Sequence, residues 1–342
     1  MNNLKLLFMR STKKFPVFDL HCDLLSYLQS APGADPAGVN DIGASLFYLQ
    51  NGGVQLQVMA IYSDVRKGST EGARAQAQVY KNLLSDYADY LVPVSDAQSV
   101  QGLVHSEKVG MVAAIENAAG FCEEDEPLEK GFEKLEEIIN TTGPILYIGI
   151  THHTENRFGG GNFSEAGLKP DGEALLEYLD GRKIAIDLSH TSDALAEGIF
   201  NYTAKHGLEV PIIASHSNFR SVMEHKRNLP DEFVQEIIAR KGLIGMNFLR
   251  AYVNNERPEA LEEHIRYGIE KGAGDVLCFG ADFFYTKDHP DKSRIPFYFQ
   301  EHENATKYAG ILERLGAEGM DEEQLRKISY ENAQSFMIRL WE

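Results

Sequence analysis

The sequence predicts an α/β protein built as a (β/α)8 TIM-type barrel with extra C-terminal helices. Eight short apolar runs alternate with longer amphipathic segments. This pattern predicts buried strands, formed by the apolar runs, that alternate with helices. Polar and apolar residues do not alternate within these runs, which is typical of strands that are buried on both faces. Eight such units favour a closed barrel over an open sheet, and 342 residues suffice for one large barrel. We therefore expect a single domain that spans residues 1–342.

The predicted strands are rich in Val, Ile, Leu and Ala. In chain order they occupy residues 15–20, 54–62, 109–116, 145–151, 183–189, 211–217, 243–248 and 276–282. Good helix formers or apolar residues three and four positions apart predict the intervening helices. These helices are expected at 72–90, 128–139, 171–179, 192–206, 231–240 and 258–271. Two further helical stretches, 294–315 and 321–340, are expected to pack on the outside of the barrel.

The chain is acidic, with 51 Asp and Glu against 33 Lys and Arg and a formal net charge of −18. This balance argues against nucleic acid or an anionic membrane as the main partner, because both require a basic face. Three cysteines are too few for a disulfide framework and suit a reducing compartment. The apolar run at 4–9 is shorter than the roughly 7–15 residues of a secretory signal core. We therefore expect a cytoplasmic protein.

Polar residues of the metal-binding type follow six of the eight predicted strands. A barrel enzyme carries its active site at the carboxyl ends of its strands, so these side chains should face one common mouth. A single histidine after a strand is more often structural, but the joint pattern is hard to obtain by chance. The residues concerned are His21, Asp23, Glu116, His152, His153, His190, His216 and Asp282.

Five of these residues predict a site for two divalent ions. Imidazole and carboxylate together suit Zn²⁺, and five ligands are too many for one tetrahedral zinc with an open position. His21 and Asp23 would hold the first ion, His190 and His216 the second, and Glu116 would bridge them. Two ions about 3.5–4 Å apart can share a hydroxide and polarise a carbonyl. The predicted cofactor is therefore Zn²⁺, two per chain.

Three further residues suit catalysis and substrate binding. Asp282 lies outside the ligand count and suits a general base that takes a proton from the bridging water and passes it to a leaving amine. The alternative is that Asp282 is a simple metal ligand. Arg227, in the loop after the sixth strand, can offer a planar fork to a substrate carboxylate, unless it pairs with a loop carboxylate instead. His152 could donate to the developing oxyanion or hold the substrate carbonyl.

These residues lie in short motifs spread from residue 19 to residue 283. The motifs are DLHCD (19–23), AIENA (114–118), ITHHTEN (150–156), IDLSH (186–190), SHSNFRSV (215–222), KRNLPDE (226–232) and FGADF (279–283). In content and order they resemble the membrane (renal) dipeptidase family of zinc metallopeptidases, a group of amidohydrolase-type barrels. The resemblance implies a binuclear zinc site that hydrolyses dipeptides, and homodimers are common in that family.

Residue by residue, the resemblance implies the same division of roles. It assigns the first metal to His21 and Asp23 and the bridge to Glu116. The second metal falls to His190 and His216, substrate binding to His152, carboxylate binding to Arg227 and proton transfer to Asp282.

The sequence departs from the family pattern at two positions. Phe284 stands where a second Asp is common, and His153 stands where an Asn is common, but every proposed ligand is present. Two other interpretations remain open. One is an amide hydrolase that acts on N-acyl amino acids, whose carboxylate Arg227 could also bind. The other is a catalytically inactive binding protein on the same barrel, against which the complete ligand set argues.

Overall fold

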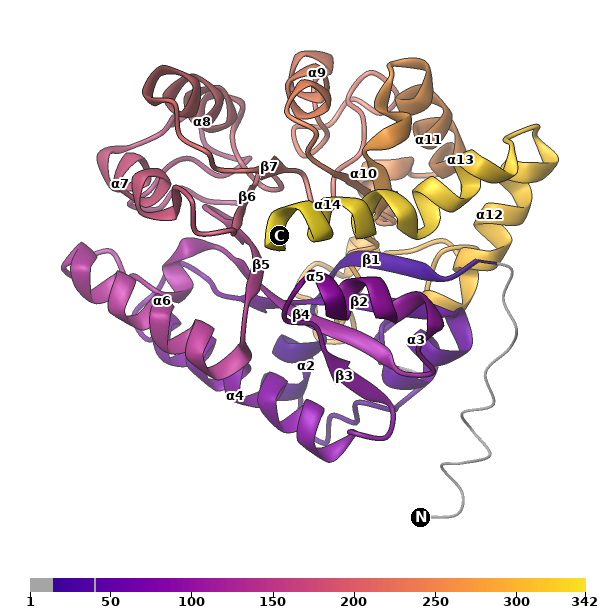
Figure 1. Ribbon diagram of the computed structural model, residues 1–342, viewed down its shortest axis with the longest axis horizontal. Coiled ribbons are helices and arrows are strands. Elements are labelled where there is room, and N and C mark those ends of the chain that lie inside the picture. Colours follow the sequence, from indigo (N-terminus) through magenta and orange to yellow (C-terminus); the bar gives the residue numbers. More distant parts are fainter. Residues whose placement is uncertain (1–14, 40) are drawn as a thin grey trace.

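The strands form a parallel barrel in the computed structural model, which describes residues 15–39 and 41–342 (Figure 1). The apolar run at 4–9 lies outside the described residues. Each predicted strand overlaps an observed one, so the predicted fold class is confirmed. The eight barrel strands are β1 Val17–Cys22, β2 Val54–Tyr62, β4 Val109–Glu116, β5 Ile145–Gly149, β6 Ala185–Asp187, β7 Ile212–Ile213, β8 Ile244–Met246 and β9 Leu277–Phe279.

The barrel closes through a short contact between β7 and β8. Hydrogen-bonded neighbours run in the order β7-β6-β5-β4-β2-β1-β9-β8. The two end strands meet at a parallel bridge between Ala214 and Ile244. Ala214 N donates to Leu243 O at 2.8 Å, and Gly245 N donates to Ala214 O at 2.8 Å. A further strand, β3 (Leu91–Pro93), pairs with β4 outside this path and was not predicted, because three residues are too few to form a recognisable pattern.

Helices surround the barrel (Figure 1). Six match the helices predicted between strands: α4 Ser69–Asp86, α6 Leu128–Thr142, α7 Pro170–Leu179, α8 Asp193–His206, α9 Asp231–Ala239 and α11 Ala260–Glu270. Four shorter ones were not predicted: α2 Leu24–Ser30, α3 Leu46–Gly52, α5 Ala97–Gly102 and α10 Arg250–Val253. The chain ends with α12 Tyr308–Ala317, α13 Glu322–Arg326 and α14 Asn332–Trp341. None of the described helices is both long and apolar enough to cross a bilayer.

The prediction of a helix from residue 294 is wrong for its first part. Only a short 3₁₀ turn at Ala305–Lys307 and α12 are helical within 295–315, and the segment 284–304 is mostly a loop. Its apolar residues Ile295, Phe297 and Tyr298 are nearly consecutive rather than spaced for one helix face. Pro296 also lacks the backbone N–H that a helix interior requires. This loop instead reaches the barrel mouth, where it lines a cavity.

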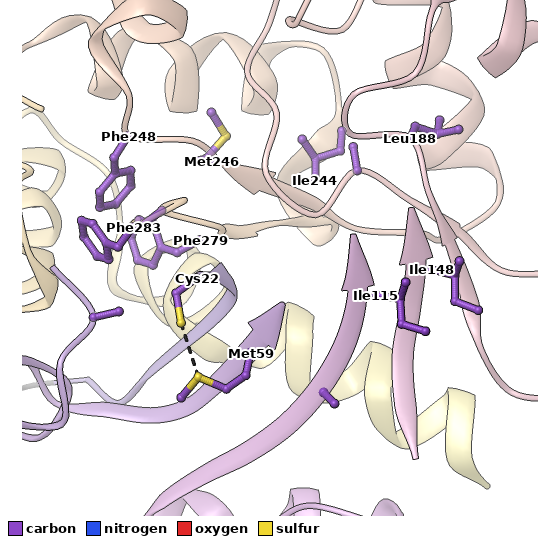
Figure 2. Close-up of a cluster of buried hydrophobic side chains, with 14 of the residues drawn as sticks. Cys22, Met59, Ile115, Ile148, Leu188, Ile244, Met246, Phe248, Phe279 and Phe283 are labelled. Atoms are coloured by element: carbon purple, nitrogen blue, oxygen red, sulfur yellow. Dashed lines mark hydrogen bonds between the residues drawn. The ribbon is translucent and has the colours of Figure 1, made fainter. Parts of the chain in front are cut away.

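Cys22 shows how the first strand divides its side chains between the core and the mouth. Its thiol is buried and lies 3.4 Å from the Met59 sulfur on the neighbouring strand β2 (Figure 2). Phe248, Phe279 and Phe283 pack together in the same hydrophobic cluster. Cys22 therefore belongs to the packed core, whereas its neighbours in sequence are left to build the site.

The C-terminal helix covers the end of the barrel opposite the mouth. α14 lies across the barrel in Figure 1 and buries Phe336, Met337 and Leu340 in a cluster with strand residues. Asn332 Nδ2 donates to Leu277 O, at the start of β9, at 2.8 Å. The hydroxyl of Ser329 donates to the carbonyl of Pro16, just before β1. The amino ends of these strands are thus closed, which leaves the carboxyl ends as the accessible face.

Candidate active site

The predicted site residues gather at the carboxyl ends of the strands. Among the described residues, donor atoms that lie within 4.8 Å of one another form four groups. One group joins Glu116 to His21 and Asp23, and a second joins it to His190 and His216. This is the division predicted for two ions. The remaining groups are His21, His216, Asp282 and His152, His153, His190.

Glu116 presents its two carboxylate oxygens to different histidines. Its Oε2 lies 3.6 Å from His21 Nε2. Its Oε1 lies 3.1 Å from His190 Nε2 and 3.6 Å from His216 Nε2. A carboxylate placed in this way can serve two ions at once, one through each oxygen. Glu116 is the last residue of β4, so a regular strand orients it.

Asp23 keeps its carboxylate available for the site. It occupies the N-cap position of α2, where an Asp side chain usually accepts a hydrogen bond from the helix backbone. Here the side chain makes no capping hydrogen bond, and its Oδ2 lies 3.8 Å from His21 Nε2.

The hydrogen bonds behind two of the histidines fix their tautomers. The Tyr147 hydroxyl donates its one proton to Leu20 O at 2.9 Å, so it accepts from His21 Nδ1 at 2.7 Å. The Ser215 hydroxyl donates to Asp187 Oδ2 at 2.5 Å, so it accepts from His216 Nδ1 at 2.6 Å. In both rings the Nε2 lone pair is left facing the site, and buried His21 Nε2 has no hydrogen-bond partner. These are the ligand states that a divalent cation requires.

Burial and charge also favour a cation in the cluster. Burial lowers the pKa of His190 and of His216 well below 6.5, which keeps these rings neutral. Burial alone would also lower the pKa of His21, but the surrounding carboxylates, led by Glu116, raise it to about 10. Burial raises the pKa of Glu116 well above its usual value. Without a cation, the raised pKa values of His21 and Glu116 let protons offset the repulsion among the buried carboxylates, and a bound cation would replace those protons.

Asp282 holds one oxygen fixed and leaves the other facing the histidines. Its Oδ2 accepts a hydrogen bond from Asn247 Nδ2 at 2.8 Å, and its Oδ1 lies 3.8 Å from His21 Nε2. Burial raises the pKa of Asp282 to about 6, although the charge on His21 opposes this shift. A buried carboxyl group with such a pKa can exchange protons near neutral pH. The same position keeps the alternative of direct coordination open, since Asp282 also belongs to a donor group.

The backbone is strained at several of the strand ends that form the site. His190 has φ 70°, Asp282 has φ 62°, and Asn117, directly after Glu116, has φ 79°. Residues other than glycine rarely adopt such angles, at a cost of about 1–3 kcal/mol each. Asp282 N donates to His21 O at 3.2 Å, which holds the turn after β9 against β1. Two other described residues, Lys183 and Lys241, share such angles before β6 and β8, at the opposite end of the barrel. The three strained residues at the mouth are the ones that adjoin the metal-binding type side chains, and strain of this kind is often found at functional sites.

Arg227 is a buried cation without an anionic partner. It is 3% exposed and donates to Ser217 Oγ at 2.8 Å and to His216 O at 3.1 Å. Its Nε has no hydrogen-bond partner, and it forms no ion pair with any carboxylate in the described part of the chain. The alternative of a paired loop carboxylate is therefore not observed. An unpaired buried charge is costly, so Arg227 is suited to receive an anion from outside the protein.

The site opens into a cavity of about 470 Å³, within the usual range for small-molecule sites. His152 lies on its wall, with Nε2 3.9 Å from Glu116 Oε1 and its ring in edge contact with Tyr62 at 4.9 Å. Burial lowers the pKa of His152 well below 6.5, so the ring is neutral and can donate one hydrogen bond. His153 also lines the cavity, but its Nδ1 contacts Asn162 Oδ1 at 2.9 Å.

Asp187 is a supporting residue to which the sequence analysis gave no role. Its Oδ1 accepts hydrogen bonds from Ser189 N at 3.0 Å and Ser215 N at 2.7 Å, and its Oδ2 accepts from the Ser215 hydroxyl that contacts His216. One buried carboxylate thus ties the end of β6 to the end of β7. It also sets the orientation of His216 through a single hydroxyl.

Asp19 is a second buried carboxylate that joins two strand ends, those of β1 and β9. Its Oδ1 accepts from His21 N at 3.0 Å and Gln57 Nε2 at 2.8 Å, and its Oδ2 accepts from Ala281 N at 2.9 Å and the Tyr308 hydroxyl at 2.6 Å. A sequence signal for both residues exists. Each begins an Asp-Leu pair within three residues of a predicted histidine ligand, in DLH (19–21) and DLSH (187–190).

We expect Asp187→Asn to weaken metal binding at the His190 and His216 position by about 10- to 100-fold, the usual cost of losing a ligand-orienting carboxylate. The amide keeps the volume but can no longer accept all three hydrogen bonds. Zinc affinity measured by competition with a chelator checks this. Asp193→Asn, at an exposed carboxylate paired with Arg220, is the matched control. Unchanged zinc affinity in Asp187→Asn would contradict the role.

Comparison with known proteins agrees with this geometry. The chain is 30% identical to "Dipeptidase verJ" of Clonostachys rogersoniana over 170 residues, which cover 45% of this chain and 42% of that protein. It spans about half the length of the curated fungal relatives it matches, 42% and 54%.

Two solved structures share the fold at 20% identity, and each match covers 96% of this chain and 99% of the other. One is the dipeptidase AC, a metallopeptidase of family M19, with a TM-score of 0.83. The other is a metallopeptidase from Rhodobacter sphaeroides bound to a phosphinate mimic of the dipeptide L-Ala-D-Ala, with a TM-score of 0.80. The family model that describes membrane dipeptidases matches residues 8–340, nearly the whole chain. The barrel, its donor groups and this match together show that the chain belongs to the membrane dipeptidase family, peptidase family M19.

Proposed function

We propose that the protein is a zinc-dependent dipeptidase that cleaves the peptide bond of dipeptides with two metal ions. The observation that carries this proposal is the position of Glu116 between two donor sets, with one oxygen toward His21 and the other toward His190 and His216. His21 and Asp23 would hold the first ion, and His190 and His216 the second. Held by these residues, zinc would supply Lewis acidity and would lower the pKa of a bound water molecule.

The residues around the ions have separate tasks in this proposal. Asp282 takes the proton of the attacking water on Oδ1 and returns it to the leaving amine. Asn247 holds the other oxygen of Asp282 and so keeps the proton-accepting oxygen directed at the site. His152, neutral and on the cavity wall, donates to the carbonyl oxygen as negative charge develops there.

Arg227 binds the free C-terminal carboxylate of the substrate. A carboxylate would supply the anionic partner that this buried guanidinium lacks, and the contact would set the distance from the chain end to the scissile bond. The Rhodobacter sphaeroides neighbour, which binds a mimic of L-Ala-D-Ala, supports a dipeptide as the substrate class. We further propose that the protein acts in the cytoplasm, where its three unpaired cysteines would stay reduced, and that it forms a homodimer.

Arg227→Met should lower kcat/KM on a dipeptide by about 10- to 100-fold, because a charge-assisted hydrogen-bond pair with the carboxylate is lost. Zinc content should stay at the wild-type level. The wild type should also prefer the dipeptide to its C-terminal amide, and Arg227→Met should not. Arg220→Met, at an arginine already paired with Asp193, is the control.

Two results with the wild-type enzyme, one on the C-terminal amide and one on an N-acetylated dipeptide, would change this proposal. Equal wild-type turnover of the acid and the amide would refute the carboxylate contact. Faster turnover of the N-acetylated dipeptide than of the free dipeptide would instead favour the hydrolase of N-acyl amino acids.

A further inference from the structure

The loop after β9 supplies an arginine, Arg294, to the wall of the cavity. Phe284, Tyr285, His289, Pro290 and Arg294, all from this loop, line it together with the metal-binding residues. None of the loop residues belongs to the proposed catalytic set. Whatever they recognise must be a part of the substrate other than the peptide bond.

Arg294 is held in place by aromatic rings rather than by a carboxylate. The side chain is half-buried, and its guanidinium carbon lies 5.1 Å from the centre of the Phe297 ring. Phe297 is buried and packs edge-on against Phe284 at 5.3 Å. A planar guanidinium stacked on a fixed ring loses little further freedom when it binds an anion. Arg294 is thus pre-oriented at the cavity wall.

Two acidic groups of the loop region, Asp291 and Asp41, have partners of their own, and the charge of Arg294 also acts on Asp291. Asp291 accepts hydrogen bonds from Ser293 N at 3.0 Å and Ser293 Oγ at 2.5 Å. Asp41 pairs with Lys287. Within residues 15–39 and 41–342, Arg294 forms no ion pair. Its guanidinium donates a hydrogen bond to Tyr252, another residue of the cavity wall, and its other donors remain available to a ligand there.

Arg294 and Arg227 act on the same side of the cavity. Arg227 lies 5.6 Å from the centre of the Tyr252 ring. Burial raises the pKa of Tyr252, and the positive charges of both arginines oppose that rise. Two guanidiniums therefore border the region around Tyr252, on which the charge of Asp282 also acts.

We propose that Arg294 is a specificity-determining residue that selects dipeptides whose C-terminal residue carries an acidic side chain. This inference rests on the proposed dipeptidase function. Arg227 binds the main-chain carboxylate of the C-terminal residue, and Arg294 binds the carboxylate of that residue's side chain. The two anions of one residue are then matched by two arginines that form no ion pair with a carboxylate in the described part of the chain.

The test compares substrates of equal size that differ in one charge. The zinc-loaded wild type should hydrolyse Ala-Asp with a kcat/KM about 10-fold higher than Ala-Asn, and Ala-Glu similarly above Ala-Gln. Arg294→Met should remove this preference, so that the ratio of acid to amide falls to about one or below. Lys292→Met is the matched control, because it removes a positive charge from the same loop without touching the cavity. It should keep the wild-type ratio.

The outcomes separate this inference from the function on which it rests. Wild-type turnover of Ala-Asp and Ala-Asn at equal rates, or an acidic preference that survives in Arg294→Met, would overturn the inference while leaving a dipeptidase. If Lys292→Met also lost the acidic preference, the preference would arise from the overall positive charge of the loop. That result would also overturn the inference about Arg294. Failure to hydrolyse any dipeptide, Ala-Ala included, would refute the proposed function and the inference with it.

Discussion

Glu116→Ala should empty both metal positions and lower kcat by about 10³-fold or more, since each bound ion contributes several kcal/mol of transition-state stabilisation. The reason is geometric. Glu116 belongs both to the donor group that it forms with His21 and Asp23 and to the donor group that it forms with His190 and His216. Its removal takes a ligand from each ion and leaves neither set with three protein ligands.

Elemental analysis checks this expectation. Wild-type protein incubated with zinc should approach two metals per chain, and Glu116→Ala should approach none. His190→Ala should mainly lose the second ion. Glu129→Ala, an exposed acidic residue in the first turn of α6, is the control for a general change of charge. A wild type that binds one zinc tightly and gains no activity from a second would contradict the two-ion site.

Asp282→Asn should lower kcat by about 10²-fold or more while zinc content stays near wild type, because general acid–base groups contribute on this scale. The substitution keeps the size of the side chain and removes the group that titrates. The amide can still contact Asn247, so the turn after β9 should persist. If the variant loses zinc instead, Asp282 is a ligand and its assignment as the base is wrong.

The pH dependence offers a second readout for the same variant. A base must be deprotonated to act, so the rate should fall as the pH drops through its pKa. Burial raises the pKa of Asp282 to about 6, and bound cations lower it, so the acid limb of kcat/KM should lie near or below pH 6. Asp282→Asn should lack this limb, whereas a variant that is merely unstable would keep it.

Some of the site followed from local sequence patterns. Glu116 ends an unbroken apolar run, and His190 and His216 follow two others. In a parallel barrel the carboxyl ends of all strands lie at the same end of the barrel. The short motifs therefore already predicted that these side chains lie together at the barrel mouth. The clustering of these residues could be predicted without knowing how the helices pack. A strand buried on both faces can be recognised from its own continuous run of apolar residues.

Other parts of the site depend on contacts between distant segments. The loop at 284–304 contains consecutive apolar residues whose partners lie elsewhere in the chain, and a helix predicted across it was partly wrong. Among the residues that the structure describes, Arg227 and Arg294 form no ion pair with a carboxylate, although the sequence contains 51 acidic residues, and this could be seen only with their neighbours in place. The support that Asp187 gives to His216 likewise joins residues 28 and 29 positions apart.

The sequence by itself determined the barrel class, the order of the eight barrel strands and the polar residues at or just beyond their carboxyl ends. These features arise from periodic burial and short-range backbone preference, which each segment carries alone. The tertiary structure decided which oxygen of Glu116 faces which histidine, how Asp19 and Asp187 hold the strand ends, and which arginines remain unpaired. These properties depend on the distances and the electrostatic interactions between side chains from separate strands. No single segment of the sequence contains that information.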